Sequence, residues 1–191
     1  MILSDSTLEK LGNETVKPFD SNKNSQKKGL SWGLTSYGYD LSLSPKEFYV
    51  ISNNPFKDEI DPKNFSKTDL GRYLTLEEDE NGIFFKIPPY THALGVSCEY
   101  ITIPRQCLAF TLNKSTYIRA GLNIPTTVLE PEWEGFLTIE MFNNTPYYLR
   151  VYAHEGICQL IYMVGDKQCK KSYLDNQGKY QYQEEKVVFS K

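Results

Sequence analysis

The sequence has few of the features that are typical of membrane proteins or of nucleic-acid-binding proteins. No apolar run reaches the roughly 18 residues that a membrane-spanning helix requires, and the first residues lack the basic-then-apolar layout of a signal peptide. A basic excess is also missing. The formal net charge at pH 7 is −3, whereas nucleic-acid-binding domains normally carry clustered Lys and Arg. These absences predict a cytoplasmic protein that binds neither membrane nor nucleic acid.

Cysteine and histidine, the usual zinc ligands, are scarce and dispersed. His92 and His154 lie far apart, and no two cysteines are close enough to form a ligand pair. The zinc-site patterns H-x-E with P-C-x-x-C, and H-E-x-x-H, are absent. We therefore expect no zinc, and free buried thiols rather than disulfides, because nothing indicates secretion. The four cysteines are Cys98, Cys107, Cys158 and Cys169.

A length of 191 residues suits one domain with its own core, and no internal repeat or long linker divides residues 1–191. Beyond residue 36 the sequence is rich in short segments of strand character, separated by Pro and Gly. Many short strands with few helical stretches predict an all-β barrel or sandwich. We expect strands over residues 37–43, 47–51, 83–87, 93–103, 108–112, 136–142, 147–152 and 157–163.

The other segments have weaker signals. A short helix is expected over residues 6–11, with Ser4 or Asp5 as its N-cap. Residues 170–191 form a polar tail whose Tyr and Gln residues would be unusual in a core. We expect a mobile loop over residues 14–30 and a loop or short helix over residues 58–70. Residues 77–80 are expected to form a solvated turn.

Residues 114–119 (KSTYIR) stand out among the strands as a short helix, and Gly121 follows as a stop signal. On a helix, Ser115 and Arg119 are four residues apart and share a face. The free N–H groups at the helix start, with Lys114 beside them, could bind an anion. The same pattern also fits a plain surface turn of helix between two strands.

An acidic cluster over residues 130–135 (EPEWEG) precedes a strand that contains Glu140. Alternation along this strand places Glu140 on its less apolar face. That face carries Phe136, Thr138 and Glu140, and the other carries Leu137, Ile139 and Met141. Glu140 is therefore either solvated or lines a pocket, and in a pocket burial would raise its pKa toward neutrality and suit it to proton transfer.

Taken in order, these stretches resemble the dCTP deaminase family, itself related to the trimeric dUTPases. The resemblance runs from about residue 2 to residue 189. It implies an all-β, dUTPase-like distorted barrel of the β-clip type with a few short helices, and a homotrimer with active sites between subunits. The matching segments are residues 34–40, 60–65, 93–95, 99–105, 114–119, 130–135, Glu140, 155–159, 172–175 and 178–181.

The resemblance implies hydrolytic deamination of dCTP to dUTP and ammonia, which would supply dUTP for thymidylate synthesis. Magnesium would arrive bound to the triphosphate, and no zinc would take part. Glu140 matches the family's catalytic glutamate, which activates the water. Ser115 matches the serine that helps to position the water, and Arg119 matches an arginine near the reacting centre.

Further positions match the family's substrate-binding residues, and the tail, from about residue 170 to 191, matches a lid over the active site. The strand before Glu140 would read the cytosine edge through backbone groups. The expected binding residues are Lys114, Thr116, Tyr117, Thr138, Ile139, Gln159, Tyr173, Lys179 and Gln183.

Several positions depart from the family pattern and leave the substrate open. Family members usually have Gly at the position of Asn113, a small residue at Ile118, and a different stretch at 125–128, where Pro125 removes a backbone donor. Tyr182 and Glu184 likewise replace small residues or Gly. A modified deoxycytidine nucleotide or a different phosphate count is therefore conceivable.

Two other functions also fit the resemblance. A dUTPase, or a bifunctional deaminase and dUTPase, would use Glu130 near the position where dUTPases keep a water-activating carboxylate, although their Gly-rich C-terminal motif is absent. A non-catalytic nucleotide-binding regulator could share the fold. We expect Tyr39 and Trp133 to be structural, and Asp40 to be bonded to backbone or to an Arg.

Overall fold

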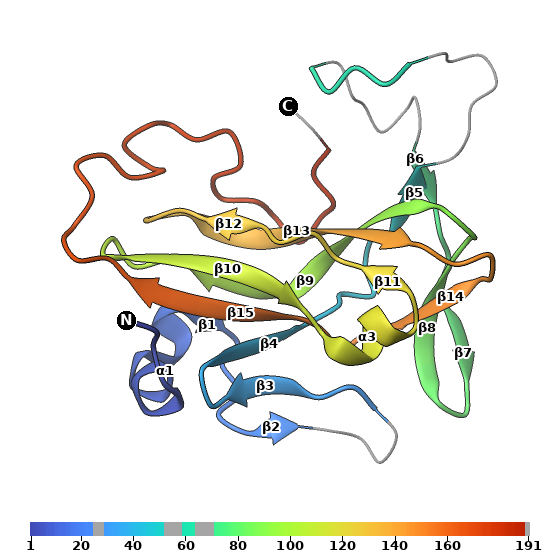
Figure 1. Cartoon of the computed structure of the whole chain (residues 1–191), viewed down its shortest axis with the longest axis horizontal. Coiled ribbons are helices and arrows are strands. Elements are labelled where there is room, and N and C mark those ends of the chain that lie inside the picture. The colour runs from blue at the N-terminus through green and yellow to red at the C-terminus, as the bar shows by residue number, and fades with distance from the viewer. Residues whose placement is uncertain (25–28, 52–58, 64–70, 190–191) are drawn as a thin grey trace.

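The computed structural model describes residues 1–24, 29–51, 59–63 and 71–189 (Figure 1). Three antiparallel sheets make up most of this part of the chain. The predicted loop over 14–30 and the predicted loop or helix over 58–70 therefore lie partly outside the described residues, as do positions 64 and 65 of the matching segment 60–65.

The first six-stranded sheet contains β1 (Val16–Lys17), β5 (Tyr49–Ile51), β6 (Gly71–Tyr73), β9 (His92–Thr102), β11 (Leu122–Asn123) and β13 (Glu134–Asn143). The second contains β2 (Lys23–Asn24), β3 (Trp32–Thr35), β4 (Gly38–Ser42), β10 (Cys107–Asn113), β12 (Val128–Leu129) and β15 (Gly156–Val164). A third sheet has three strands, β7 (Glu77–Asp79), β8 (Gly82–Ile87) and β14 (Leu149–Tyr152).

Helical structure is confined to short segments. These are α1 (Asp5–Leu11), a 3₁₀ turn η1 (Gly12–Glu14) and α3 (Ser115–Arg119). Within the described ranges, no helix has the length and apolar character needed to cross a membrane. The prediction of an all-β fold with a few short helices is confirmed, and the predicted helices over 6–11 and 114–119 match α1 and α3 to within one residue.

The core forms where the inward faces of the sheets meet. Alternating apolar side chains from each sheet join one buried cluster, since successive residues of a strand point to opposite faces. Phe48 and Phe85 stack within it, with ring centroids 4.4 Å apart. Members from different strands include Leu41, Phe85, Ile101, Ile139 and Leu160.

The structure corrects two predictions of irregular structure. Residues 14–24 contain two short strands rather than only loop, because β1 pairs with β9 and β2 pairs with β3. Residues 77–80 include β7, which pairs with β8 although Glu77 and Glu78 are exposed, as predicted for a solvated segment. In these polar segments the backbone N–H and C=O groups are hydrogen-bonded to neighbouring strands. The polarity of the side chains gives no sign of this pairing.

The C-terminal tail packs along the first sheet instead of extending from the domain. Figure 1 shows it leaving β15, looping outward and returning beside β12 and β13. Gly135 and Gln183 form a parallel β-bridge, and Phe136 N–H donates to the Gln183 carbonyl at 3.0 Å. A Cβ at Gly135 would lie only 2.7 Å from Gln183 N. Glycine therefore permits this close contact between tail and strand.

Candidate functional site

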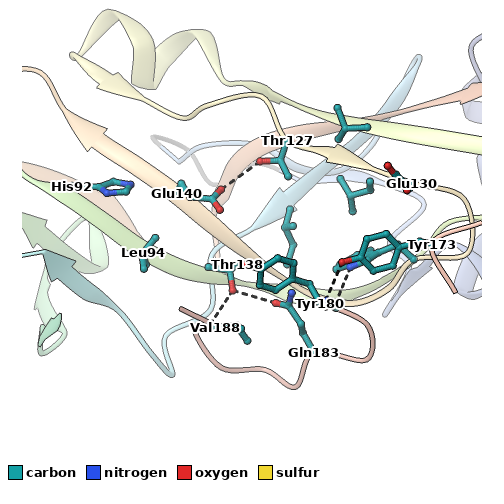
Figure 2. A pocket seen from close by; sticks show the side chains of 14 residues that line it. His92, Leu94, Thr127, Glu130, Thr138, Glu140, Tyr173, Tyr180, Gln183 and Val188 are labelled. Atoms are coloured by element: carbon teal, nitrogen blue, oxygen red, sulfur yellow. Dashed lines mark hydrogen bonds between the residues drawn. The ribbon is translucent and has the colours of Figure 1, made fainter. Parts of the chain in front are cut away.

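A cavity of about 410 Å³ lies between β13, the β12 segment and the tail. This volume falls within the range of small-molecule sites. Figure 2 shows side chains from the strands and from the tail pointing toward a shared space. The lining residues are His92, Leu94, Thr127, Val128, Leu129, Glu130, Trp133, Leu137, Thr138, Glu140, Tyr173, Tyr180, Gln183 and Val188.

Glu140 projects from β13 into this cavity. The buried Ile139 and Met141 on either side of it face the core, so the predicted alternation holds over residues 139–141. Leu137, expected on the opposite face, lines the cavity as well, because the pairing with β9 is irregular at this residue. Thr127 donates its hydroxyl to Glu140 Oε2 at 3.4 Å. Burial raises the pKa of the Glu140 carboxyl above its usual value. Of the two environments open from the sequence, the structure gives the pocket, where a raised pKa makes the carboxyl a better proton acceptor than an exposed glutamate.

Thr138 ties the tail to the same strand. Its hydroxyl donates to Gln183 Oε1 at 3.3 Å and accepts from Val188 N–H at 3.0 Å. Tyr173 also lines the cavity, and its hydroxyl accepts from Tyr180 N–H at 2.9 Å. The tail thus covers the Glu140 cavity in the same chain, and three predicted binding residues, Thr138, Tyr173 and Gln183, meet there.

Trp133 supports the cavity from the acidic loop. Its side chain is buried, and its indole N–H donates to the Tyr180 carbonyl at 2.9 Å. Arg105 forms ion pairs with Glu132 of this loop and, at 2.8 Å, with Asp175 of the tail. The structural role expected for Trp133 therefore includes holding the tail against the loop.

The structure does not bring the α3 residues to the Glu140 cavity. Ser115 and Arg119 are exposed on α3, and neither lines that cavity. A second cavity of about 470 Å³ lies beside α3. It is lined by Gly29, Leu30, Ser31, Asp40, Asn113, Lys114, Ser115, Thr116 and Gln159. The predicted residues therefore separate into a glutamate cavity and a cavity beside α3.

Four predicted residues line neither of these two cavities, and one of them is Arg119, which is exposed on α3. Tyr117 is 3% exposed, and its hydroxyl accepts from Tyr152 N–H at 2.9 Å. The Ile139 side chain is buried in the core, which leaves only its backbone for ligand contact. Lys179 is exposed on the tail.

Lys114 neutralises a buried carboxylate. Its Nζ lies 2.6 Å from Asp40 Oδ2 and donates to the Ser31 carbonyl at 2.8 Å. The side chains of Lys114 and Asp40 are only 12% and 5% exposed. The partner expected for Asp40 is backbone or an Arg. The structure shows Lys114 instead, because Lys114 directly follows β10 and its side chain reaches across β15 to Asp40 on β4.

Replacing Lys114 by methionine should lower the free energy of unfolding by about 3 kcal/mol or more, because it leaves the Asp40 charge buried and unpaired. Urea denaturation followed by circular dichroism measures this loss. The double variant Asp40→Asn/Lys114→Met removes both charges and should regain part of the stability. Equal stability of Lys114→Met and the unaltered protein would contradict the assignment.

The structure accounts for two sequence departures and one expected contact. Asn113 does not need the backbone freedom of glycine, because it ends β10 without a positive φ and its Oδ1 accepts from Ile124 N–H at 2.7 Å. Pro125 is exposed, so its missing donor leaves no buried acceptor unpaired beside it. Gln159 donates to Thr35 Oγ1 at 2.8 Å and faces the cavity beside α3.

His92 is a cavity residue that sequence reasoning did not assign. It lies on β9, where it pairs with Phe142, while Glu140 pairs with Leu94. The two side chains therefore share one face of the sheet as diagonal neighbours, and Figure 2 shows them next to each other. Burial lowers the pKa of His92. Only the register of β9 against β13 identifies this neighbour, and the sequence alone does not give that register.

Metal-ligating side chains do not converge in the part of the chain that the structure describes. No group of three His, Cys, Asp or Glu residues is placed to hold an ion there. The described cysteines are free thiols, with Cys107 and Cys158 buried and Cys98 and Cys169 half-buried.

The chain is an all-β protein whose tail covers a cavity of ligand size that contains a candidate acid–base carboxylate. Residues 2–165 match the family model described as dCTP deaminase-like. The chain therefore belongs to the dCTP deaminase-like family, as its motifs predicted. The tail, from about residue 170 to 191, lies outside the matched segment.

Relatives and a solved structure agree with this membership. A dCTP deaminase of Acidobacterium capsulatum is 44% identical over 169 residues, which cover 88% of this chain and 87% of that protein. A dCTP deaminase of Chlamydia muridarum is 42% identical, covering 88% and 87%. The crystal structure of the 2′-deoxycytidine 5′-triphosphate deaminase of Agrobacterium tumefaciens shares the fold, with a TM-score of 0.65 at 14% identity over 88% of this chain and 50% of that chain.

Proposed function

We propose that this protein hydrolyses dCTP, taken as its magnesium complex, to dUTP and ammonia without zinc. The observation that carries the proposal is the position of Glu140, a part-buried carboxylate in a cavity of ligand size. The choice of dCTP as substrate is supported by membership of the dCTP deaminase-like family and by relatives that are named dCTP deaminase. We place the reaction in the cytoplasm, where the dUTP that it forms would be used for thymidylate synthesis.

The chemistry requires one base that returns its protons. Glu140 would take a proton from water as the water oxygen bonds to C4 of cytosine, and would pass that proton to N3. It would then carry the second water proton to the 4-amino group, so that the C4–N bond breaks and ammonia leaves. A raised pKa suits this shuttle, since the carboxyl must gain and lose protons easily. Backbone groups of Thr138 and Ile139 would read the cytosine edge.

The remaining residues are proposed to come from a neighbouring subunit of a homotrimer. Ser115 and Arg119 are exposed beyond the Glu140 cavity of their own chain, and cyclic symmetry can set them against the cavity of the next subunit. Ser115 would position the water, and Arg119 would orient Glu140 and stabilise developing negative charge.

The cavity beside α3 would take the phosphates and sugar. It contains Lys114, whose ammonium also pairs with Asp40, and the polar side chains of Ser31, Ser115, Thr116 and Gln159. The tail would close over the nucleotide as a lid. The proposed binding residues of these two regions are Lys114, Thr116, Gln159, Tyr173, Lys179 and Gln183, whereas Tyr117 is buried and supports α3 through its hydrogen bond to Tyr152.

The proposal is tested by incubating the purified protein with dCTP and magnesium, measuring ammonia release and separating the nucleotides by anion exchange. We expect one ammonia for each dUTP formed. Parallel reactions with dCMP and 5-methyl-dCTP test the alternative substrates. Nucleotide binding without turnover of any of them would overturn the deaminase and favour a regulator.

The pH dependence of turnover should report the Glu140 carboxyl. Glu140 must be ionised to accept a proton from water, so kcat should fall as the pH drops through its raised pKa. The Thr127 hydroxyl stabilises the charged form, so Thr127→Val should move this acid limb to higher pH. The measurement is kcat at saturating dCTP across the acid to neutral range. Thr126→Val, at an exposed neighbouring position, is the control, and identical limbs in all three proteins would contradict the assignment.

A second candidate function is a bifunctional deaminase and dUTPase. The observation that favours it is Glu130, a second carboxylate lining the Glu140 cavity. Its water would attack a phosphate and yield dUMP and pyrophosphate. Appearance of dUMP that disappears in Glu130→Gln, with ammonia release retained, would establish this second step.

A further inference from the structure

The pairing of β9 with β13 changes register immediately before the Glu140 segment. Phe136 pairs with Tyr100, but Thr138 pairs with Val96. Leu137 alone therefore stands opposite three residues of β9, which are Ser97, Cys98 and Glu99. This is a β-bulge with two extra residues on β9. Bulges next to active sites commonly change the direction of the strand and its side chains.

The hydroxyl of Ser97 replaces the strand pairing that the bulge interrupts. Leu137 N–H donates to Ser97 Oγ at 2.9 Å, and Ser97 Oγ donates to the Glu99 carbonyl at 2.7 Å. Ser97 is fully buried, with 0% of its surface exposed. A buried backbone N–H requires a partner. Ser97 supplies that partner for Leu137, and its hydroxyl also bonds to the carbonyl of Glu99 within the bulge.

The bulge is fixed to the last residue of β4 and to the irregular segment that follows this strand. The Glu99 carboxylate accepts from Ser42 N–H at 3.0 Å and from the Ser42 hydroxyl at 2.7 Å. At the residue of β9 just before the bulge, the Val96 carbonyl accepts from Ser44 N–H at 2.8 Å. Ser97 thus lies between two attachments, one to Ser42 at the end of β4 and one to Ser44 just after it. Because these attachments fix the position of Ser97, its hydrogen bond to Leu137 N–H can hold β13 in place.

We propose that Ser97 is a positioning residue for the proposed deamination, acting through Leu137 N–H on the direction of Thr138 and Glu140. Leu137 lines the Glu140 cavity. The next residue, Thr138, holds the tail, and Glu140 follows two residues later on the same face. One hydrogen bond therefore sets the start of the segment that carries both the carboxylate and the contacts of the tail. The inference rests on the proposed role of Glu140.

Loss of the hydroxyl leaves Leu137 N–H buried without its partner, and β13 must shift or admit water to satisfy it. A displacement of about 1 Å at a catalytic group can reduce turnover by about 10²-fold. Ser97→Ala should therefore lower kcat by about 10- to 100-fold. The KM for dCTP should change less, because the proposed phosphate contacts lie at the base of α3. Ser97→Thr, which keeps the hydroxyl, should retain kcat within about threefold of the unaltered protein.

The matched control is Thr15→Val. Thr15 is also fully buried, and its hydroxyl donates to the Gly12 carbonyl at 3.0 Å, but it lines no part of the Glu140 cavity. Both Ser97→Ala and Thr15→Val should lower the midpoint of thermal unfolding, and only Ser97→Ala should lower kcat. An equal loss of stability with kcat unchanged in both variants would overturn the proposal.

A variant of nearly unchanged volume keeps the test decisive if Ser97→Ala does not fold. Ser97→Cys replaces the hydroxyl by a much weaker hydrogen-bonding group, so its kcat should fall below that of Ser97→Thr. Unaltered kcat in Ser97→Cys would reject the positioning role. An active Glu140→Gln would instead reject the proposed function, so the two failures are distinguishable.

Discussion

Glu140→Gln should lose dCTP turnover by about 10²- to 10⁴-fold, the usual contribution of a general acid–base group. Glutamine has the same shape as glutamate, and its carbonyl can still accept from Thr127, so the cavity should keep its form. The amide cannot take a proton from water at neutral pH. Ammonia release gives the rate, and calorimetric titration with dCTP should show that binding is retained within a few-fold.

The control is a second glutamate of the same strand. Glu134 lies at the start of β13, and its Oε2 accepts from the Thr102 hydroxyl at 3.4 Å. It lines no part of the Glu140 cavity. Glu134→Gln removes the same charge from the same strand, and its turnover should stay close to that of the unaltered protein. Comparable losses in both variants would mean that strand charge or stability, rather than proton transfer by Glu140, controls the rate.

Much of the fold was predictable because buried strands have a simple physical signature. Alternating apolar residues identified β13, and the predicted strand over 157–163 lies within β15 (Gly156–Val164). The missed strands β1 and β2 have two residues each and polar neighbours. Their stability depends on backbone pairing with distant partners, which leaves no period in the local sequence.

The candidate site was predictable to the extent that its residues lie in recognisable motifs. Strand alternation placed Thr138 and Glu140 on one face and left open whether that face is solvated. The resemblance assigned both residues to the site and added Gln183 and Tyr173, and the structure brings all four to one cavity. His92 and Ser97 lie on the partner strand, and only its register against β13 gives them their neighbours. A bulge that shifts this register by two residues is not visible in a single sequence.

The separation of the predicted residues into two cavities has a direct consequence. Glu140 lies in one cavity, and Ser115 lies in the other with Arg119 exposed on the same short helix. If catalysis needs both groups, they must come from different chains, or α3 must move within one chain. A symmetric trimer satisfies the first arrangement without any change in the fold, because every subunit offers both surfaces.

Mixing two inactive variants distinguishes these arrangements. Glu140→Gln and Arg119→Ala should each be nearly inactive alone. When the two are unfolded together and refolded as mixed trimers, a site between chains is intact if its glutamate comes from the Arg119→Ala chain and its arginine from the Glu140→Gln chain. For equal random mixing this occurs in about one quarter of the sites, so about one quarter of the unaltered dCTP turnover should return.

Separately refolded variants combined afterwards should remain inactive, provided that trimers do not exchange subunits, and they serve as the control. If both groups act within one chain, every mixed site contains one defect, and no activity can return. A recovery near one quarter, together with a trimeric mass by light scattering, would therefore assign Glu140 and Arg119 to different subunits of one active site. Its absence in trimers that refold fully would instead require α3 to reach the glutamate of its own chain.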